Sequence, residues 1–456
     1  MAFTSSSPGA GDGTLTLTLI PGLPDDIAAL ILASLPYSHR SRIRPTARAW
    51  HAFLSSASVA PLRRRLRLPP SHILCLFPSD PALVRPLLFD PAAAAWAPLP
   101  PLPCSPYLYG LSNFATIALG PHLYVLGGSH FDARSYPLGL PSPSAAVHRI
   151  DLSAAPAPHL LSWTRMPDML SPRGSFACAP IAGANAIIVA GGGSRHAVFP
   201  SGGTRMSSVE TFDVLSGKWA PAMGLPRYRA GCVGFFLRRG IRKLKDEEEL
   251  DYDEEEEFWV MGGYGDYRPV AGVVPANVYY RDVLVLGLRS GNWREIGDMW
   301  NSRERHKLGQ VVVMDGEDGD VKGVFMLDRN VIFRHDKFQR GASISFNNVI
   351  ITTGGARSLY NFASNRWLKE SSLRRAVPLE DSRGFVAMNG ELCVLTSMPF
   401  VEPLEPGRSS RSRMTLEIQA YDPKRKKWSS SRAKTFAELP HSISTVAALL
   451  LSSNQR

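Results

Sequence analysis

The chain has 456 residues, of which 44% are hydrophobic and 9% aromatic, and it carries 38 Gly and 37 Pro. So many turn-forming residues favour an all-β body over long helices, and the length fits one large repeat domain plus a small one. The formal net charge of +11 is spread over separate basic clusters without interleaved aromatic residues, so we expect no direct nucleic-acid binding.

The residue pattern also argues against a membrane or disulfide-bonded protein. No run approaches about 18 consecutive apolar residues, and the start of the chain lacks the basic and apolar regions of a secretory signal. We therefore expect a protein of the cytoplasm, the nucleus or both. The cysteines, Cys75, Cys104, Cys178, Cys232 and Cys393, are scattered, which predicts reduced thiols and neither a disulfide framework nor a zinc site.

The first structured segment, residues 19–58, predicts a small helical module. Ile27, Leu30, Ile31 and Leu35 recur at helical spacing and would form one apolar face. Prolines frame this helix, one in its first turn and one at its end. A module this small cannot bury both faces of its helices, so its remaining apolar surface should contact another protein. A cap on the following domain is the alternative.

This module resembles the F-box, which docks on the Skp adaptor of a cullin-RING ubiquitin ligase. The residues that match are Leu23, Pro24, Asp25, Ile27, Ile31, Leu32, Leu35, Pro36, Ile43, Arg48, Trp50 and Phe53. The resemblance implies adaptor contacts for Leu23, Pro24, Ile27, Ile31, Leu35, Pro36, Ile43, Trp50 and Phe53. Two residues depart from the family: Pro45 lies near the hinge of the second and third helices, where it would weaken docking, and Ala47 replaces the usual Cys.

Irregular segments are expected on both sides of the module. Residues 1–18 are rich in Ser and Gly, which predicts disorder. Residues 59–70 are rich in Arg and are interpreted as a linker to the main domain.

A tryptophan recurs through residues 71–456 and defines a repeat. Its copies are Trp96, Trp163, Trp219, Trp293, Trp367 and Trp428. In all but the second copy a turn-forming residue stands at the same spacing before the Trp: Asp90, Asp213, Gly287, Asn361 and Asp422. Apolar residues precede each of these turn residues, so every copy predicts a β-hairpin that the Trp closes.

Two more strands complete the repeat. A β-rich run that ends in paired glycines precedes three of the hairpins, at Gly127, Gly191 and Gly262, and in three repeats a strand led by Arg lies further upstream. Four strands are the content of one propeller blade. The order resembles the kelch repeat, so the sequence predicts a mainly β fold: a six-bladed kelch-type β-propeller over 71–456, preceded by the all-α F-box module.

Two insertions and one closing strand are predicted within the propeller. Residues 240–257 contain a dense acidic run after a basic one and are interpreted as a solvated insertion. Residues 335–359 interrupt blade five and are interpreted as a loosely packed insertion. The alternative makes Val349–Gly355 the diglycine strand of that blade. The segment Ile443–Leu451 is β-compatible and should complete blade one, because a closed ring leaves no open strand edge.

Long loops after the diglycine strands of blades two, three and four should lie on one face and bind a target protein. Arg and Tyr, which are enriched in binding hot spots, point to an acidic or phosphorylated target segment. The residues predicted to bind it are Arg134, Tyr136, Arg173, Arg195, His196, Arg205, Arg229, Tyr264, Tyr267, Arg268 and Arg383. For Arg173, Arg229 and Arg383, which lead the inner strands, the alternative is that they only brace neighbouring blades.

Catalytic motifs are absent from the sequence. It contains no paired metal-binding His on a helix, no nucleophile elbow and no phosphate-binding loop, and nothing assembles the copper site of kelch oxidases, so we expect no cofactor and no metal. The sequence therefore predicts a non-catalytic receptor that brings a target to a Skp–cullin ubiquitin ligase. A propeller that binds a small molecule or acts as an enzyme outside the ubiquitin system is the alternative.

Overall fold

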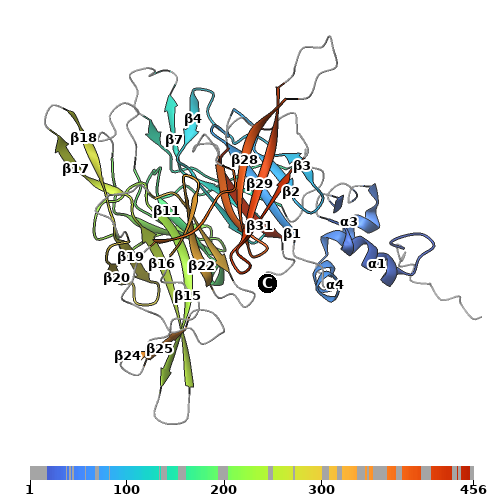
Figure 1. Ribbon diagram of the computed structural model, residues 1–456. Coiled ribbons are helices and arrows are strands. Elements are labelled where there is room, and N and C mark those ends of the chain that lie inside the picture. The colour runs from blue at the N-terminus through green and yellow to red at the C-terminus, as the bar shows by residue number, and fades with distance from the viewer. Residues whose placement is uncertain are drawn as a thin grey trace, which may run out of the picture.

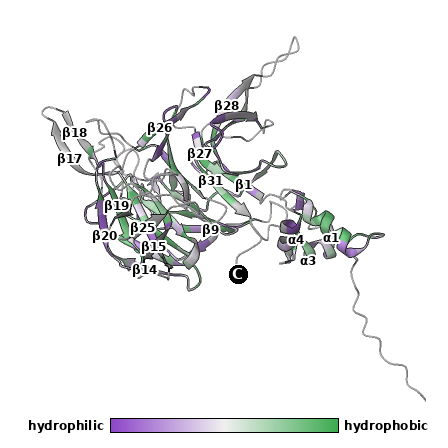
Figure 2. Ribbon diagram, turned by 60° about the horizontal axis from the view of Figure 1, so that its bottom comes forward, coloured by the Kyte–Doolittle hydropathy of each residue, from purple (hydrophilic) through white to green (hydrophobic). Residues whose placement is uncertain are grey.

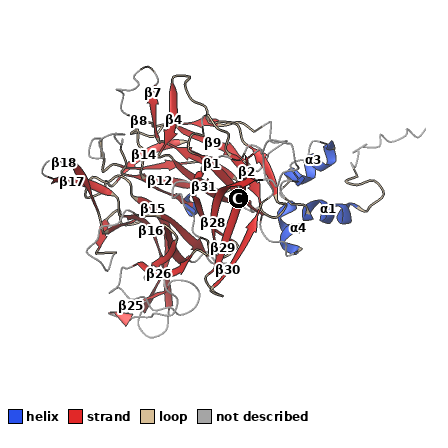
Figure 3. Cartoon of the chain, turned by 45° about the horizontal axis from the view of Figure 1, so that its top comes forward, coloured by secondary structure: helices blue, strands red, loops and turns tan. Residues whose placement is uncertain are grey.

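Six antiparallel sheets lie around a common centre in the computed structural model, five of them four-stranded and one extended to six strands, with a small helical module at one side (Figure 1, Figure 3). The structure describes residues 18–36, 39–40, 43, 46–56, 58–66, 71–81, 83–132, 134, 141–152, 161–193, 204–244, 250–270, 273–299, 308–315, 321–335, 345–346, 349–352, 367–375, 383–401, 412–433, 439 and 443–451. None of the helices in these ranges is long and apolar enough to cross a membrane.

Each sheet is one propeller blade. Blade one contains β1 (Ser71–Pro78), β2 (Leu87–Asp90), β3 (Ala95–Pro98) and β31 (Ile443–Leu451), and blade two contains β5 (Ala115–Leu119), β6 (His122–Leu126), β9 (Val147–Asp151) and β10 (Thr164–Met166). Blade three contains β11 (Ala177–Ile181), β12 (Ala186–Ala190), β13 (Val209–Asp213) and β14 (Lys218–Ala222). In blade four lie β15 (Val233–Leu244), β16 (Leu250–Met261), β19 (Val283–Gly287) and β20 (Trp293–Ile296).

Blade five contains β21 (Gln310–Asp315), β22 (Val321–Asp328), β23 (Val331–His335) and β26 (Trp367–Ser372), and blade six contains β27 (Arg383–Met388), β28 (Glu391–Val401), β29 (Ser412–Asp422) and β30 (Lys427–Arg432). The innermost strands β5, β11, β21, β27 and β31 line a central cavity of about 1180 Å³. The predicted six-bladed propeller is confirmed.

The turn residue and the Trp of the repeat have different structural roles. Asp213 accepts hydrogen bonds from the backbone N–H groups of Leu215 (2.8 Å) and Ser216 (3.3 Å), which fixes the hairpin turn. Trp219 packs on Phe212 with ring centroids 5.0 Å apart, and its Nε1 donates a hydrogen bond to Pro167 O of the preceding blade (3.0 Å). Trp163, Trp293 and Trp428 donate equivalent bonds to Pro100, Met223 and Ser371, so these Trp residues tie their blades to the blade before.

The diglycine motif brings neighbouring blades into backbone contact. Gly127 and Gly191 have φ of +56° and +65°, which favours glycine. A Cβ at Gly127 would lie 2.4 Å from Arg173 O, and one at Gly191 would lie 2.3 Å from Arg229 O. The glycines are therefore required because the next blade's Arg-led segment passes directly against them.

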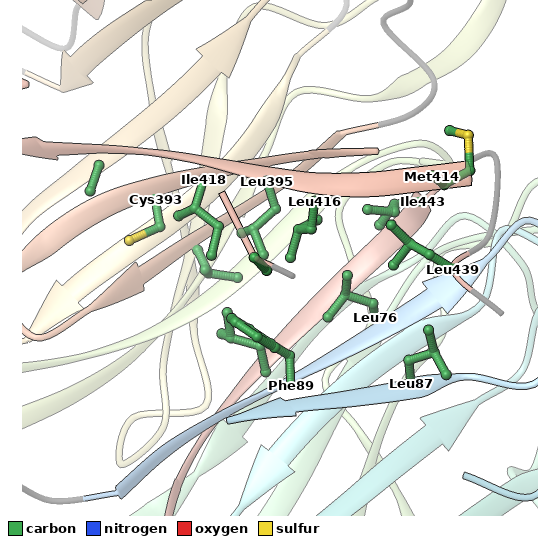
Figure 4. Packing of buried hydrophobic residues seen from close by; sticks show 14 residues of the cluster. Leu76, Leu87, Phe89, Cys393, Leu395, Met414, Leu416, Ile418, Leu439 and Ile443 are labelled. Atoms are coloured by element: carbon green, nitrogen blue, oxygen red, sulfur yellow. The ribbon is translucent and has the colours of Figure 1, made fainter. Parts of the chain in front are cut away.

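The C-terminal strand closes the ring, as predicted. β31 pairs antiparallel with β1 from Ser71 opposite Leu451 to Pro78 opposite Ile443. Figure 4 shows Leu76 and Phe89 of blade one packed beside Leu395 and Leu416 of blade six and Ile443 of β31. The first and last parts of the chain thus share one hydrophobic core.

The predicted insertion at 240–257 has regular secondary structure, and it reaches beyond the part of β16 that pairs with β19. These residues extend β15 and β16 into one long hairpin, in which Arg238 stands opposite Glu256 and Arg239 opposite Glu255. Cross-strand pairs of opposite charge stabilise such a hairpin, whereas an isolated acidic run would repel itself. Glu257 is fully buried and accepts a hydrogen bond from Trp259 Nε1 at 2.9 Å.

Blade five does carry an insertion, as predicted, although its boundary is shifted. β23 pairs directly with β26, and β25 (Val349–Thr352) pairs with β15 of blade four and with β24 (Ser345–Phe346), so the alternative diglycine strand is wrong. His335 belongs to β23, where it is buried with its ring 4.9 Å from that of Trp367. The insertion therefore begins after His335. Its packing lies outside the described residues except for β24 and β25.

Deleting residues 336–359 is expected to leave the propeller folded, with a free energy of unfolding within about 1 kcal/mol of the parent, because a shorter surface loop changes closure entropy little. The described strands of this segment, β24 and β25, pair with each other and with β15 of blade four, and not with a strand of blade five. Thermal unfolding followed by circular dichroism measures the effect. Deletion of β23 (Val331–His335) is the matched control, and it should unfold the blade. If the loop deletion behaves like this control, the insertion is part of the blade.

The predicted linker is partly wrong. Residues Val59–Arg65 form the helix α4, which packs on α1 (Asp25–Ser34) and α3 (Arg48–Ser55). Val59 is buried because it lies in this helix interface. The Ser- and Gly-rich start up to residue 17 and Pro45 lie outside the described residues.

Candidate functional site

The helix α1 has two apolar faces, of which only one is buried by the module itself. Ala28 and Leu32 are 0% and 2% exposed and face the other helices. Leu23, just before the helix, and Ile27 and Ile31 within it are 39%, 42% and 43% exposed. These three residues, spaced by four, form an apolar ridge on one side of the module, and Figure 2 shows α1 with hydrophobic residues outside the propeller.

Side-chain hydrogen bonds hold α1 in place. Arg63 of α4 donates from Nη1 to the carbonyl oxygens of Ala33 (2.7 Å) and Leu35 (3.2 Å) at the C-terminal end of α1. These carbonyls have no partner inside the helix, so a cation there is favourable. At the other end Trp50 Nε1 donates to Leu19 O, and Asp25 accepts from Leu19 N at 2.8 Å. The ridge is therefore presented by a fixed helix.

The other predicted adaptor residues are placed as follows. Pro24 is exposed, whereas Leu35, Pro36, Ile43, Trp50 and Phe53 are half-buried. The structure thus brings Leu23, Pro24, Ile27 and Ile31 together as one accessible surface. The half-buried residues serve in part to hold the helices together.

Three predicted target residues are buried, and this corrects their assignment. Arg173 and Arg229 are 0% exposed and Arg383 is 3% exposed. Arg173 bonds Gly191 O at 2.8 Å and pairs with the buried Glu210. Arg229 makes the equivalent contacts in blade four: it donates a hydrogen bond to Gly262 O at 2.6 Å and forms an ion pair with Asp282 at 2.7 Å. Because a side chain without exposed surface cannot contact a partner, these arginines fit the alternative, that they brace the blades.

Two predicted arginines lie next to aromatic rings on the face where the chain leaves the diglycine strands, here called the loop face. The guanidinium of Arg205 lies 5.4 Å from the ring centre of Tyr264, and this contact connects the loops of blades three and four. The guanidinium of Arg134 lies 5.0 Å from the ring centre of Tyr107. A hydrogen bond from Arg134 lowers the pKa of the Asp132 carboxyl to about 2, so part of the charge of Arg134 is already compensated.

Small sheets build parts of this loop face. The loops of blade two form a three-stranded sheet of β4 (Leu108–Ser112), β7 (Ser129–Asp132) and β8 (Ser142–Pro143). The loop of blade four forms a hairpin of β17 (Tyr264–Val270) and β18 (Val273–Tyr279).

The remaining predicted residues are not described in full. Tyr136, Arg195 and His196 lie outside the described residues. Tyr267 and Arg268 lie on β17, of which only the backbone is described at these positions.

Two exposed tyrosines on the loop face were missed by the sequence reasoning. Tyr107 is 53% exposed and Tyr228 is 63% exposed. Tyr228 directly precedes the Arg-led strand of blade four, so its position beside Arg229 could have revealed it. Tyr107 had no such signal, because it lies in a connection between blades. In the described part of the chain no group of His, Cys, Asp and Glu side chains is arranged to hold a metal ion.

Comparison with known proteins gives the family. The F-box/kelch-repeat protein OR23 of Arabidopsis thaliana is 44% identical over 430 residues, which cover 92% of this chain and 88% of that protein. The F-box/kelch-repeat protein SKIP30 of the same plant is 25% identical over 62% of this chain and 75% of its own length.

Other comparisons are weaker. No description of a known protein family matches the chain. A solved structure titled "Structure of YjhT" shares 13% identity, with a TM-score of 0.40 over 72% of this chain and 85% of that one. The similarity to OR23 spans most of both chains at well above 30% identity, and on that basis the chain belongs to the F-box/kelch-repeat proteins of plants.

Proposed function

We propose that this chain is the substrate-receptor subunit of a Skp–cullin–F-box ubiquitin ligase and has no catalytic role of its own. The helical module docks the Skp-type adaptor, and the propeller holds the target protein. The exposed apolar ridge of Leu23, Ile27 and Ile31 is the observation that carries this proposal, because nothing in the described chain covers it. The names of the F-box/kelch-repeat relatives support the same kind of role.

The ridge suits a docking surface energetically. Helix-in-groove recognition uses apolar side chains at spacings of three and four residues, as found here. Burying the exposed parts of three such side chains contributes about 3 kcal/mol, given roughly 25 cal/mol for each Å² of apolar surface. Ubiquitin transfer then needs only proximity, since a rigid propeller raises the effective concentration of the bound target near the ligase.

The target is proposed to bind the loop face through an acidic or phosphorylated segment. Arg205 with Tyr264 and Arg134 with Tyr107 pair a cation with an aromatic ring there, the residue types enriched in hot spots. Arg134 is bidentate to Asp132, so part of its charge is compensated. Guanidinium groups match carboxylate and phosphate geometry, which accounts for the expected acidic partner.

Affinity capture of binding partners from a plant extract by the tagged full chain tests adaptor docking and target binding separately. The double change Ile27→Asp with Ile31→Asp should weaken adaptor recovery at least about a hundredfold, because two charges would enter an apolar contact worth about 3 kcal/mol. Target recovery and thermal unfolding should stay unchanged. Quantitative mass spectrometry of the tagged full chain measures both recoveries.

Matched controls separate docking from general surface effects. Leu215→Asp places the same charge on an exposed apolar residue of the propeller, 84% exposed, and should leave adaptor recovery intact. Arg205→Glu should remove the target and spare the adaptor, whereas Arg425→Glu, in the turn after β29 on the opposite face, should spare both. Adaptor recovery that survives the double change at Ile27 and Ile31 would contradict the proposed docking.

A further inference from the structure

A cavity of about 310 Å³ lies between blades one and two, under the three-stranded sheet of the loop face. Leu108 and Leu111 of β4 and His130 of β7 line it from that sheet, and His148 of β9 lines it from blade two. Cavities that bind small organic ligands start at about 300 Å³ and are mainly apolar with a few placed polar groups. The lining here follows that composition.

Two imidazoles lie among the polar groups of the cavity, which also include Ser105, Ser144 and Arg165. His148 is only 7% exposed, and His130 is half-buried. Burial lowers the pKa of both side chains, that of His148 to about 4, so both rings are neutral near pH 7. A net hydrogen bond to such a buried neutral ring contributes about 0.5–1.5 kcal/mol, so His148 can fix the orientation of a bound molecule.

The charges around the cavity limit the chemistry of its ligand. Arg165 also lines the cavity, but it is paired with Asp168 at 2.6 Å. No carboxylate is among the described lining residues, so a cation would lack a counter-ion. An anion would have to separate the Arg165–Asp168 pair. The lining therefore favours an uncharged ligand.

We propose that this cavity binds a small, uncharged and mainly apolar organic molecule that carries a hydroxyl or carbonyl group, which hydrogen-bonds to His148. The leucines of β4 and the edge of β6 contact its apolar body. Residues of β4 and β7 on the loop face line the cavity, so an occupant would lie beside the proposed target surface. This proposal does not rest on adaptor docking, and its failure would leave that function untouched.

Binding of 2-naphthol to the purified full chain tests the proposal, with naphthalene as the analogue without a hydroxyl and 2-naphthoate as the charged analogue. Isothermal titration should give measurable affinity for 2-naphthol, about tenfold weaker binding of naphthalene, and no binding of 2-naphthoate, because one hydrogen bond distinguishes the first two. His148→Leu keeps an apolar lining of similar size, so it should remove the tenfold preference and leave naphthalene bound. His122→Leu, outside the cavity, is the matched control and should change nothing.

Alkylation of Cys104 gives a second readout that needs no variant. Cys104 lies at the cavity, and it is exposed while Cys75, Cys232 and Cys393 are buried. Bound 2-naphthol should slow its reaction with iodoacetamide several-fold, as measured by peptide mass spectrometry. The proposal is overturned if 2-naphthol neither binds nor protects Cys104, which would mean a cavity filled by water only. It is equally overturned if His148→Leu weakens both probes alike.

Discussion

Ending the chain after Pro440 is expected to unfold the whole propeller and not only its last strand. This truncation removes β31, which pairs with β1 along its full length and buries Ile443 and Leu449 completely. Lost burial of two such side chains alone costs about 3–6 kcal/mol, and the exposed edge of β1 loses its backbone hydrogen bonds as well. A domain with a total stability of about 5–15 kcal/mol does not survive that loss.

Thermal unfolding of the truncated chain, followed by near-ultraviolet circular dichroism, measures the effect. The matched control ends after Leu451 and keeps all of β31, so its midpoint should equal that of the full chain. An unchanged midpoint for the shorter truncation would show that blade one is stable with three strands and that the ring does not depend on this closure.

Replacing Arg173 by Met should destabilise the propeller by about 3–5 kcal/mol, because it leaves the carboxylate of Glu210 buried without its cation. The hydrogen bonds to Gly191 O (2.8 Å) and Ser208 O (3.1 Å) are lost with it. Since the guanidinium is fully buried, the expected loss is in stability and not in binding. Urea unfolding of the purified variant measures the change.

Two variants make this test specific. The combined change Arg173→Met with Glu210→Met removes both charges and should recover a large part of the stability. Arg165→Met breaks a pair whose side chains are about half exposed, Arg165 with Asp168, and should cost less than about 1 kcal/mol. If the Arg173→Met variant stays stable but no longer recovers the target, Arg173 is a binding residue and not a structural one.

Local patterns in the sequence were sufficient to predict the propeller blades and the helical module. The spacing from Asp213 to Trp219 predicts the hairpin, because the Asx turn and the ring contact with Phe212 need only neighbouring residues. The diglycines mark strand ends through backbone geometry that other residues avoid. The closing strand followed from counting strands, since a ring cannot leave an edge unpaired.

Tertiary contacts decided what the sequence pattern could not. Arg173 precedes β11, and its partner Glu210 lies on β13 of the same sheet. The sequence does not reveal this pairing, so an Arg at this position is equally compatible with a binding role and with a structural role. The acidic and basic runs of the β15–β16 hairpin stabilise each other only because register places Arg238 opposite Glu256. Helix α4 is held against α1 in part by Arg63, which reaches the end of α1 in a contact between residues about 30 positions apart.

The candidate sites were likewise predictable from sequence only in part. Helical spacing alone predicted that Ile27 and Ile31 share one side of α1, and the structure added which side the module leaves uncovered. The cavity beside His148 had no sequence signal, because its walls come from segments around residues 102–111, 125–130 and 144–165 that meet only when blades one and two pack together. Periodicity encodes the position of a residue on its own element, and burial is set by which elements lie against it.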